Sequence, residues 1–157
     1  MHHGLSITPT SQLDLVAYPN ANWANNLDNH KSTGGYCIYL GSSLVSWNAK
    51  KQSIVCCSST ESEYRSLVNT TTELAWIQSL LIELHVYLPQ TLIIWCDNMS
   101  ASALVANPIL HACSKHIKLD FHFLYRYKTT NISANSPNFP WFFLQEIRGL
   151  PISIFHQ

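Results

Sequence analysis

Apolar and polar positions follow one another in short runs through the first third of the chain, which is the pattern of strands bounded by turns. Polar residues crowd Asn20–Thr33 and again Asn48–Gln52, and both stretches predict loops. Gly41-Ser42-Ser43 predicts a tight hairpin turn. The pattern therefore predicts a first strand joined to an antiparallel meander, with strands at Leu13–Tyr18, Gly35–Leu40, Leu44–Trp47 and Ser53–Cys57.

The apolar positions change to a helical period from Thr60 to about Leu84. The start is marked by a capping-box pattern, Ser58-Ser59-Thr60-Glu61, in which a hydroxyl and a carboxyl group satisfy backbone N–H groups of the first turn. Pro89 predicts the end of this region, because proline cannot continue a helix. A long helix is therefore expected after the strands.

The second half begins with Leu92–Cys96, an apolar run without alternation that is typical of a central strand buried on both faces. Helices are expected at Ser100–Ala106 and Ser114–Lys128, and Asn131–Pro140 predicts a loop. This order predicts an α/β fold with a mixed central sheet, in which an antiparallel meander and a long helix precede the buried central strand.

Composition narrows the class of protein. With 157 residues, 46% of them hydrophobic and 11% charged, the chain suits one globular domain. Nine basic residues cancel nine acidic ones, so no basic field of its own indicates a nucleic-acid partner. The five cysteines fit no disulfide framework and are expected as buried thiols of a reducing compartment. No run suits a membrane span and the start lacks a signal peptide, so an intracellular location and no membrane partner are expected.

Acidic residues are rare, and two of them suggest a site. Asp97 follows a predicted strand, where sites form in α/β sheets, and Glu63 is placed in the first turn of the long helix. Carboxylates that converge bind hard cations such as Mg²⁺, and two such ions can clamp a phosphodiester. For each acid alone another interpretation stays open, since Glu61 and Glu63 can complement the helix dipole and Asp97 can cap the next helix.

Four runs form an ordered set of motifs: Ala17–Ala24 (AYPNANWA), Lys31–Gly41 (KSTGGYCIYLG), Ser46–Leu67 (SWNAKKQSIVCCSSTESEYRSL) and Trp95–Ala103 (WCDNMSASA). Each run is short, but the ordered set is specific. It resembles the ribonuclease H domain at the end of copia-type retrotransposon polyproteins, over roughly Gly4 to Phe123. The resemblance implies an RNase H-like fold for residues 1–128.

The resemblance also implies a function, the Mg²⁺-dependent endonucleolytic hydrolysis of RNA in RNA–DNA hybrids during reverse transcription. Glu63 and Asp97 match two of the family's four metal-binding carboxylates. The implied partners are the hybrid and the reverse transcriptase domain of the parent polyprotein. Asn98, Thr60 and Lys51 are the expected substrate contacts, although Lys51 can equally be part of a solvated hairpin end.

Two departures from the family pattern bear on this activity. Asn20 stands at the first catalytic aspartate, so the shape and one oxygen of that ligand remain while its charge is lost. Residues 129–157 do not resemble the family, and Glu146 is their only acid. We therefore expect an incomplete C-terminal part, followed by a divergent tail such as a frameshift leaves. Two function classes stay open, an impaired hybrid nuclease and a non-catalytic remnant that binds nucleic acid weakly or not at all.

A histidine-rich stretch offers one further kind of site. His111, Cys113, His116 and His122 are residue types that zinc accepts. Their spacing matches no standard zinc finger, and His116 and His122 fall on different faces of the predicted helix. The resemblance makes this stretch an ordinary helix, and that interpretation is preferred.

Overall fold

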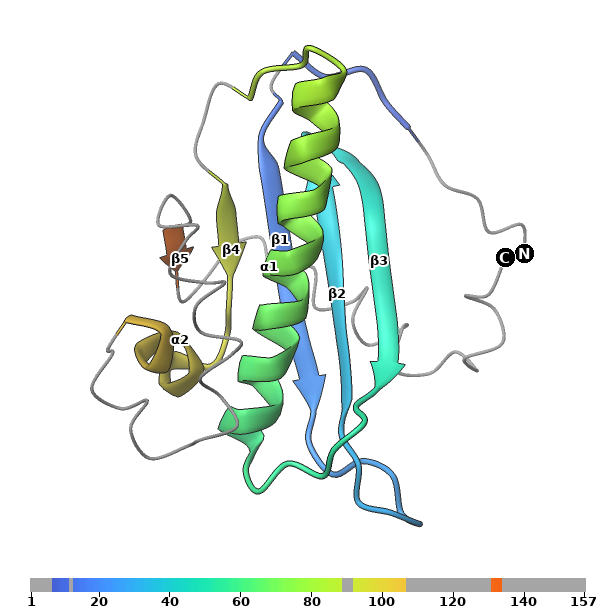
Figure 1. The fold of residues 1–157 in the computed structure, drawn as a ribbon, viewed down its shortest axis with the longest axis vertical. Coiled ribbons are helices and arrows are strands. Elements are labelled where there is room, and N and C mark those ends of the chain that lie inside the picture. Colours follow the sequence, from blue (N-terminus) through green and yellow to red (C-terminus); the bar gives the residue numbers. More distant parts are fainter. Residues whose placement is uncertain (1–6, 12, 89–91, 107–130, 134–157) are drawn as a thin grey trace.

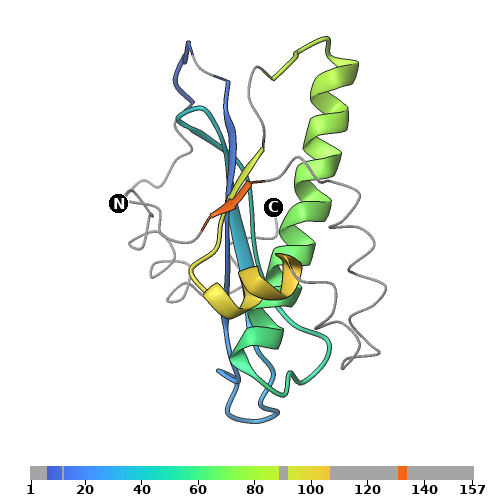
Figure 2. The same ribbon diagram turned by 90° about the vertical axis from the view of Figure 1, so that its left-hand side faces the viewer.

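The computed structural model describes residues 7–11, 13–88, 92–106 and 131–133. A five-stranded sheet in the order β3-β2-β1-β4-β5 carries a long helix, α1, along one face (Figure 1; Figure 2). The short helix α2 lies beside the first turns of α1. The elements are β1 (Leu15–Asn22), β2 (Thr33–Leu40), β3 (Ser43–Lys51), α1 (Ser59–Glu83), β4 (Ile93–Trp95), α2 (Met99–Ala106) and β5 (Asn131–Ser133).

The sheet is mixed, as the sequence predicts. β1, β2 and β3 form an antiparallel meander, whereas β4 pairs parallel to β1 and β5 parallel to β4. The hairpin between β2 and β3 turns at Gly41, whose φ of 59° is a left-handed conformation that glycine adopts without steric cost. The RNase H-like α/β arrangement that the resemblance implies is thus present in the described residues.

The hydrophobic core lies between α1 and the sheet. Full burial of a large apolar side chain contributes about 1.5–3 kcal/mol to the free energy of folding, so the layer between helix and sheet is the main source of stability. From α1 it takes Leu67, Leu74, Ile77 and Leu81, and from the sheet and its flank Leu15, Ala17, Tyr36, Ile38, Leu92 and Ile94.

The start of α1 confirms the capping motif. The Ser58 hydroxyl accepts a hydrogen bond from the backbone N–H of Glu61 at 3.1 Å, and the Glu61 carboxylate accepts one from the N–H of Cys57 at 2.9 Å. The helix ends at Glu83, and His85 then adopts a φ of 59°. The chain therefore leaves the helix before Pro89, which lies outside the described residues.

Four segments differ from the sequence-based prediction. The expected loop at Asn20–Thr33 is wrong at both ends, because pairing extends β1 to Asn22 and β2 begins at Thr33. The expected loop at Asn48–Gln52 is wrong at its start, because pairing with β2 extends β3 to Lys51. Ser53–Cys57 is no strand, because the pairing of β2 with β3 stops at Thr33 and Lys51. The loop predicted from Asn131 is wrong over its first three residues, which form β5.

The predicted central strand is present but shorter and less buried. β4 spans three residues, of which only Ile94 is fully buried, so its other face is only half-covered. The helix predicted at Ser100–Ala106 is confirmed as α2. The helix predicted at Ser114–Lys128 lies outside the described residues, and the domain boundary between residues 128 and 129 stays a prediction.

Three of the four described cysteines are buried, and all four are free thiols, as the sequence predicts. Cys57 is exposed and is the exception to the expected burial. In the described part of the chain, no helix combines the length and the apolar character that crossing a bilayer requires.

One buried hydroxyl fixes α1 on the sheet. The Ser66 Oγ lies 2.8 Å from the backbone oxygen of Asn20 in β1 and 2.8 Å from that of Gly35 in β2. A hydroxyl carries one proton, which these two carbonyl groups share. Gly34 lies under this contact: a Cβ there would be in ordinary van der Waals contact with Ser66 Cβ at 3.6 Å and would crowd the Gln52 side chain, whose Nε2 would be 3.1 Å away.

We expect Ser66→Ala to lower the free energy of unfolding by about 1–3 kcal/mol, because it removes the donor that two carbonyl groups share. Ser79→Ala is the matched control, since the Ser79 hydroxyl bonds only to the Ala75 carbonyl of its own helix. Its effect should stay within about 0.5 kcal/mol. Urea denaturation of both variants measures the difference, and equal effects would contradict the role given to Ser66.

Candidate functional site

The carboxyl ends of β1 and β4 form an opening in the sheet. The two strands pair only at Val16 with Ile93 and Ala17 with Ile94, and they run in the same direction. Pro19 lies beyond this pairing, where its missing N–H interrupts no bond to β4. Divergence of two parallel strands at their carboxyl ends is the usual place for a site in an α/β sheet.

Asn20 and Asp97 flank this opening. Asn20 follows Ala17 and Asp97 follows Ile94, each three residues beyond the last β1–β4 pair and toward the same end of the sheet. Asn20 is 6% exposed, whereas Asp97 is exposed. Asn20 also belongs to β1, and not to the loop that the sequence pattern predicts for it.

Glu63 approaches the same opening from α1. It is the fifth residue of the helix, so its predicted place in the first turn is wrong and it lies in the second. Its side chain is 8% exposed. Ser66 lies three residues later on the same helical face, and its hydroxyl donates to the Asn20 carbonyl oxygen. Glu63 therefore lies about one helical turn from a residue that contacts β1.

Cys96 lies within electrostatic range of both carboxylates. Burial raises the pKa of its thiol to about 11, and the negative charges of Glu63 and Asp97 raise it further, against a hydrogen bond to the Asn98 carbonyl that lowers it. Both acids are therefore close enough to this one sulfur atom to affect its ionisation. Asn20, Glu63 and Asp97, far apart along the chain, gather at one end of the sheet.

Neighbouring residues take the helix-capping roles that the sequence left open for the acids. Asn98, and not Asp97, caps α2, since its side-chain oxygen accepts a hydrogen bond from Ala101 N at 3.0 Å. Glu61 holds the start of α1 and forms an ion pair with Arg65 at 3.1 Å. The capping roles thus belong to Asn98 and Glu61, which leaves Asp97 and Glu63 for the opening.

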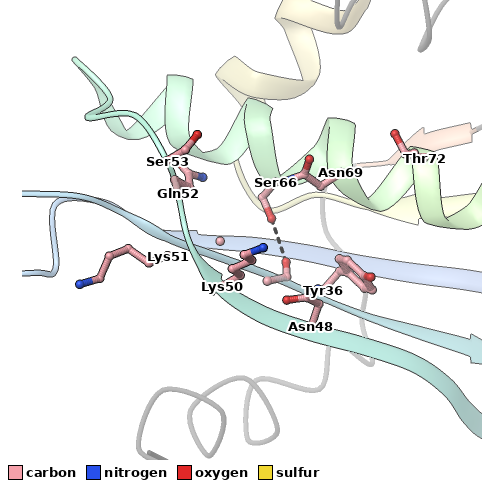
Figure 3. A pocket seen from close by; sticks show the side chains of 11 residues that line it. Tyr36, Asn48, Lys50, Lys51, Gln52, Ser53, Ser66, Asn69 and Thr72 are labelled. Atoms are coloured by element: carbon pink, nitrogen blue, oxygen red, sulfur yellow. Dashed lines mark hydrogen bonds between the residues drawn. The ribbon is translucent and has the colours of Figure 1, made fainter. Parts of the chain in front are cut away.

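The other expected substrate contacts are dispersed. Thr60 is the second residue of α1 and is half-buried. Lys51 ends β3, which lies three strands from β4, about 14 Å away at ordinary strand spacing. Lys51 instead belongs to a groove of about 410 Å³ between α1 and the β2–β3 hairpin (Figure 3). The structure therefore does not bring Lys51 to the opening.

The donor set at the opening consists of oxygen atoms, two from carboxylates and one from an amide. Hard cations prefer oxygen ligands, but the affinity of a site for them depends on how many of its ligands are negatively charged. Within the described ranges, no group of three His, Cys, Asp or Glu side chains lies together. These residues therefore do not fit a centre of two Mg²⁺ ions. The zinc candidates His111, Cys113, His116 and His122, and Glu146 of the tail, lie outside the described residues.

Sequence reasoning missed the residues that tie the start of α1 to the ends of the strands. Trp23 donates its indole N–H to the Cys56 carbonyl at 3.0 Å, which ties the loop after β1 to the segment before α1. Gln52 donates to the Ser62 carbonyl and accepts from the Cys56 thiol, both at 2.9 Å. The contacts of Trp23 with Cys56 and of Gln52 with Ser62 span 33 and 10 positions, so no local pattern reveals them.

The chain is similar to segments of much longer proteins. It is 49% identical over 122 residues to the retrovirus-related Pol polyprotein from transposon RE2 of Arabidopsis thaliana, and 47% identical over 123 residues to that from transposon RE1. The corresponding polyprotein from transposon TNT 1-94 of Nicotiana tabacum is 34% identical over 110 residues. These matches cover 70–78% of this chain but only 8% of each polyprotein. No protein-family model matches the chain.

Solved structures share the fold at low identity. The foamy viral protease-reverse transcriptase in complex with dsDNA superposes with a TM-score of 0.57 at 12% identity, over 84% of this chain and 87% of that chain. LC11-RNase H1 in complex with RNA/DNA hybrid superposes with a TM-score of 0.52 at 10% identity, over 79% and 86%. The fold thus defines an RNase H-like domain. The chain belongs to the Pol polyproteins of copia-type retrotransposons and spans about 8% of the length of those relatives.

The site geometry predicts which thiols react. Burial raises the pKa of Cys96 to about 11 and that of Cys37 to about 12, so at pH 8 almost none of either is thiolate, the nucleophilic form. Exposed Cys57 should react with a disulfide reagent at least about a hundredfold faster. Mass spectrometry of a Cys113→Ser background identifies the labelled residue, with urea-unfolded protein as the control. Equally fast labelling of Cys96 would show that it is not buried between the two acids.

Proposed function

We propose that this RNase H-like domain binds RNA–DNA hybrids for a retrotransposon reverse transcriptase, and that its hydrolysis of the RNA strand is impaired. The ancestral activity is Mg²⁺-dependent endonucleolytic cleavage. One observation carries the proposal: a buried neutral amide, Asn20, lies in β1 just beyond its pairing with β4, at the position where the family resemblance requires a carboxylate.

The ancestry is supported by kinship and by the place of the site. The relatives are retrovirus-related Pol polyproteins, and one structural neighbour is an RNase H1 that holds an RNA/DNA hybrid. Glu63 and Asp97 gather at the carboxyl ends of parallel strands, as the resemblance requires. The reverse transcriptase domain of the same polyprotein is the implied partner, because the hybrid is the product of reverse transcription.

The impairment follows from charge. Mg²⁺ bound in a site of this kind activates water and stabilises the leaving oxygen. Asn20 offers the oxygen of a ligand without its negative charge, and an amide cannot compensate the positive charge of an ion. Two carboxylates, one buried and one exposed, then remain at the site. Without a bound cation they repel phosphate groups, so hybrid binding would rest on other contacts, whereas turnover would lack one of the metal ligands that it requires.

The first test is cleavage of a labelled RNA–DNA hybrid by the purified chain in Mg²⁺. We expect a rate at least about a hundredfold below that of an intact RNase H1, the size of effect that loss of one electrostatic stabiliser produces. Hybrid binding, measured by fluorescence anisotropy, should persist. Robust cleavage that disappears in both Asp97→Asn and Glu63→Gln would contradict the impairment, whereas absence of hybrid binding would contradict the function.

The second test restores the missing charge. Asn20→Asp places a carboxylate beside two others, so without divalent metal we expect the variant to be less stable by about 1–3 kcal/mol at pH 7. Burial raises the pKa of the introduced carboxyl group, so the loss disappears below about pH 4 and grows as the pH rises. Mn²⁺ or Mg²⁺ should then raise the melting temperature of the variant more than that of the wild type.

Asn29→Asp is the matched control, because Asn29 is exposed and its side-chain oxygen accepts a bond from Lys31 N that a carboxylate also accepts. Thermal melting with and without metal, at pH 4 and 7, compares the two variants. If both respond alike, Asn20 does not lie among the acids. We expect no full recovery of cleavage in Asn20→Asp, since no residue of this chain matches the fourth metal-binding carboxylate of the family.

A further inference from the structure

The groove between α1 and the β2–β3 hairpin lies on the other side of α1 from β4 and takes no part in the proposed hydrolysis. Its volume is about 410 Å³, within the range of small-ligand sites. It follows α1 for two turns, from Ser66 to Thr72, which corresponds to about 9 Å. Figure 3 shows the side chains that line it.

Two glycines, which have no side chains, form the floor of this groove. Gly34 and Gly35 lie at its base, beside the buried hydroxyl of Ser66 and the buried ring of Tyr36. A Cβ on Gly35 would lie 2.6 Å from the Asn48 backbone oxygen, so no larger residue fits there without a shift of β3. The groove is therefore built into the pairing of β2 with β3.

The rim of the groove is polar and positively charged. Its exposed residues are two lysines, two asparagines, a serine and a threonine, and none of the lining residues that the structure describes is acidic: Asn48, Lys50, Lys51, Ser53, Asn69 and Thr72. Figure 3 shows Lys50 directed toward α1 across the groove, whereas Lys51 extends away from it. One cation thus faces a row of amide and hydroxyl groups.

Glu73 gives the groove a direction. Its carboxylate accepts a hydrogen bond from the Ser46 hydroxyl at 2.9 Å. Burial raises the pKa of Tyr36, whose ring closes the far end of the groove, and the charge of Glu73 raises it further. An anion is repelled at that end and attracted at Lys50. A ligand with a negative group at one end and neutral hydrogen-bonding groups at the other matches this arrangement, and a nucleotide unit has this form.

We propose that the groove binds one nucleotide of a single nucleic-acid strand, with the phosphate at Lys50 and the neutral part between Asn48 and Asn69. Both rims are exposed along the length of the groove, so a chain can enter and leave it. The helix α1 would then contact nucleic acid on both flanks, at Glu63 and at Asn69. This contact does not depend on metal or on the acids of the opening.

The experiment measures binding of a fluorescent twelve-residue oligothymidylate to the full chain by anisotropy, in EDTA and over a range of salt. Lys50→Gln should weaken binding about fivefold or more and reduce the slope of log affinity against log salt by about 0.7, the value for one phosphate contact on a single strand. Asn69→Trp fills the groove at an exposed helical position. Asn69→Trp should weaken binding about as much as Lys50→Gln, but it should change the slope of log affinity against log salt little, because it removes no charge.

Lys31→Gln is the charge-matched control, because Lys31 does not line the groove. It should change affinity less than about twofold, and Asp97→Asn should not weaken binding. Absence of oligonucleotide binding, or Lys50→Gln and Asn69→Trp that bind like the wild type, would overturn the proposal. Hybrid binding that fails while the Lys50 effect persists counts against the proposed function alone.

Discussion

The bond from the Ser66 hydroxyl to the carbonyl oxygens of Asn20 and Gly35 is the contact on which the site geometry depends. It joins α1 to two neighbouring strands at once, so it fixes both how far along the sheet the helix lies and how it is rotated. The core side chains alone permit small shifts, because apolar packing is not directional. Because Glu63 lies one turn before Ser66, the same bond sets the position of the buried acid relative to β1. Gly34, next to this bond, also lines the groove on the other flank.

Asn20 has opposite consequences for stability and for chemistry. A carboxylate at this 6% exposed position would be a buried charge at the end of the sheet that already holds Glu63 and Asp97, and it would be costly unless a cation balanced it. An amide keeps nearly the same volume and removes the charge. Compared with an aspartate, the amide thus avoids the cost of burying a charge in the metal-free fold, and it would hold a divalent cation less tightly. Retention of the fold and a weaker metal site are therefore compatible, and they have one physical cause.

Local signals predicted the elements that local forces decide. The hydroxyl and carboxylate at Ser58 and Glu61 marked the start of α1, and the apolar run before Asp97 marked β4. The sequence pattern failed where pairing decides: polar Asn22 and Lys51 end strands because β2 offers them partners. Apolar Ser53–Cys57 lacks a partner and is no strand. Glu63 and Asp97 could be nominated because acids are rare here, whereas the roles of Ser66 and of the groove depend on contacts across 31 to 46 positions of sequence.

The zero net charge of the chain conceals a separation of charge across α1. Glu63 and Asp97 lie toward β4, whereas Lys50 and Lys51 lie toward the edge strand β3. Lysines suit an edge strand for a separate reason, because their charge opposes pairing with a further strand. A nucleic acid that approaches this face is attracted by the lysines on the β3 flank and repelled by the acids on the β4 flank. Only a bound cation turns the repulsion by the acids into attraction. Nucleic-acid binding to the metal-free domain should therefore rest on few phosphate contacts, and global charge is a poor guide to it, because fields at this range are set by the nearest groups.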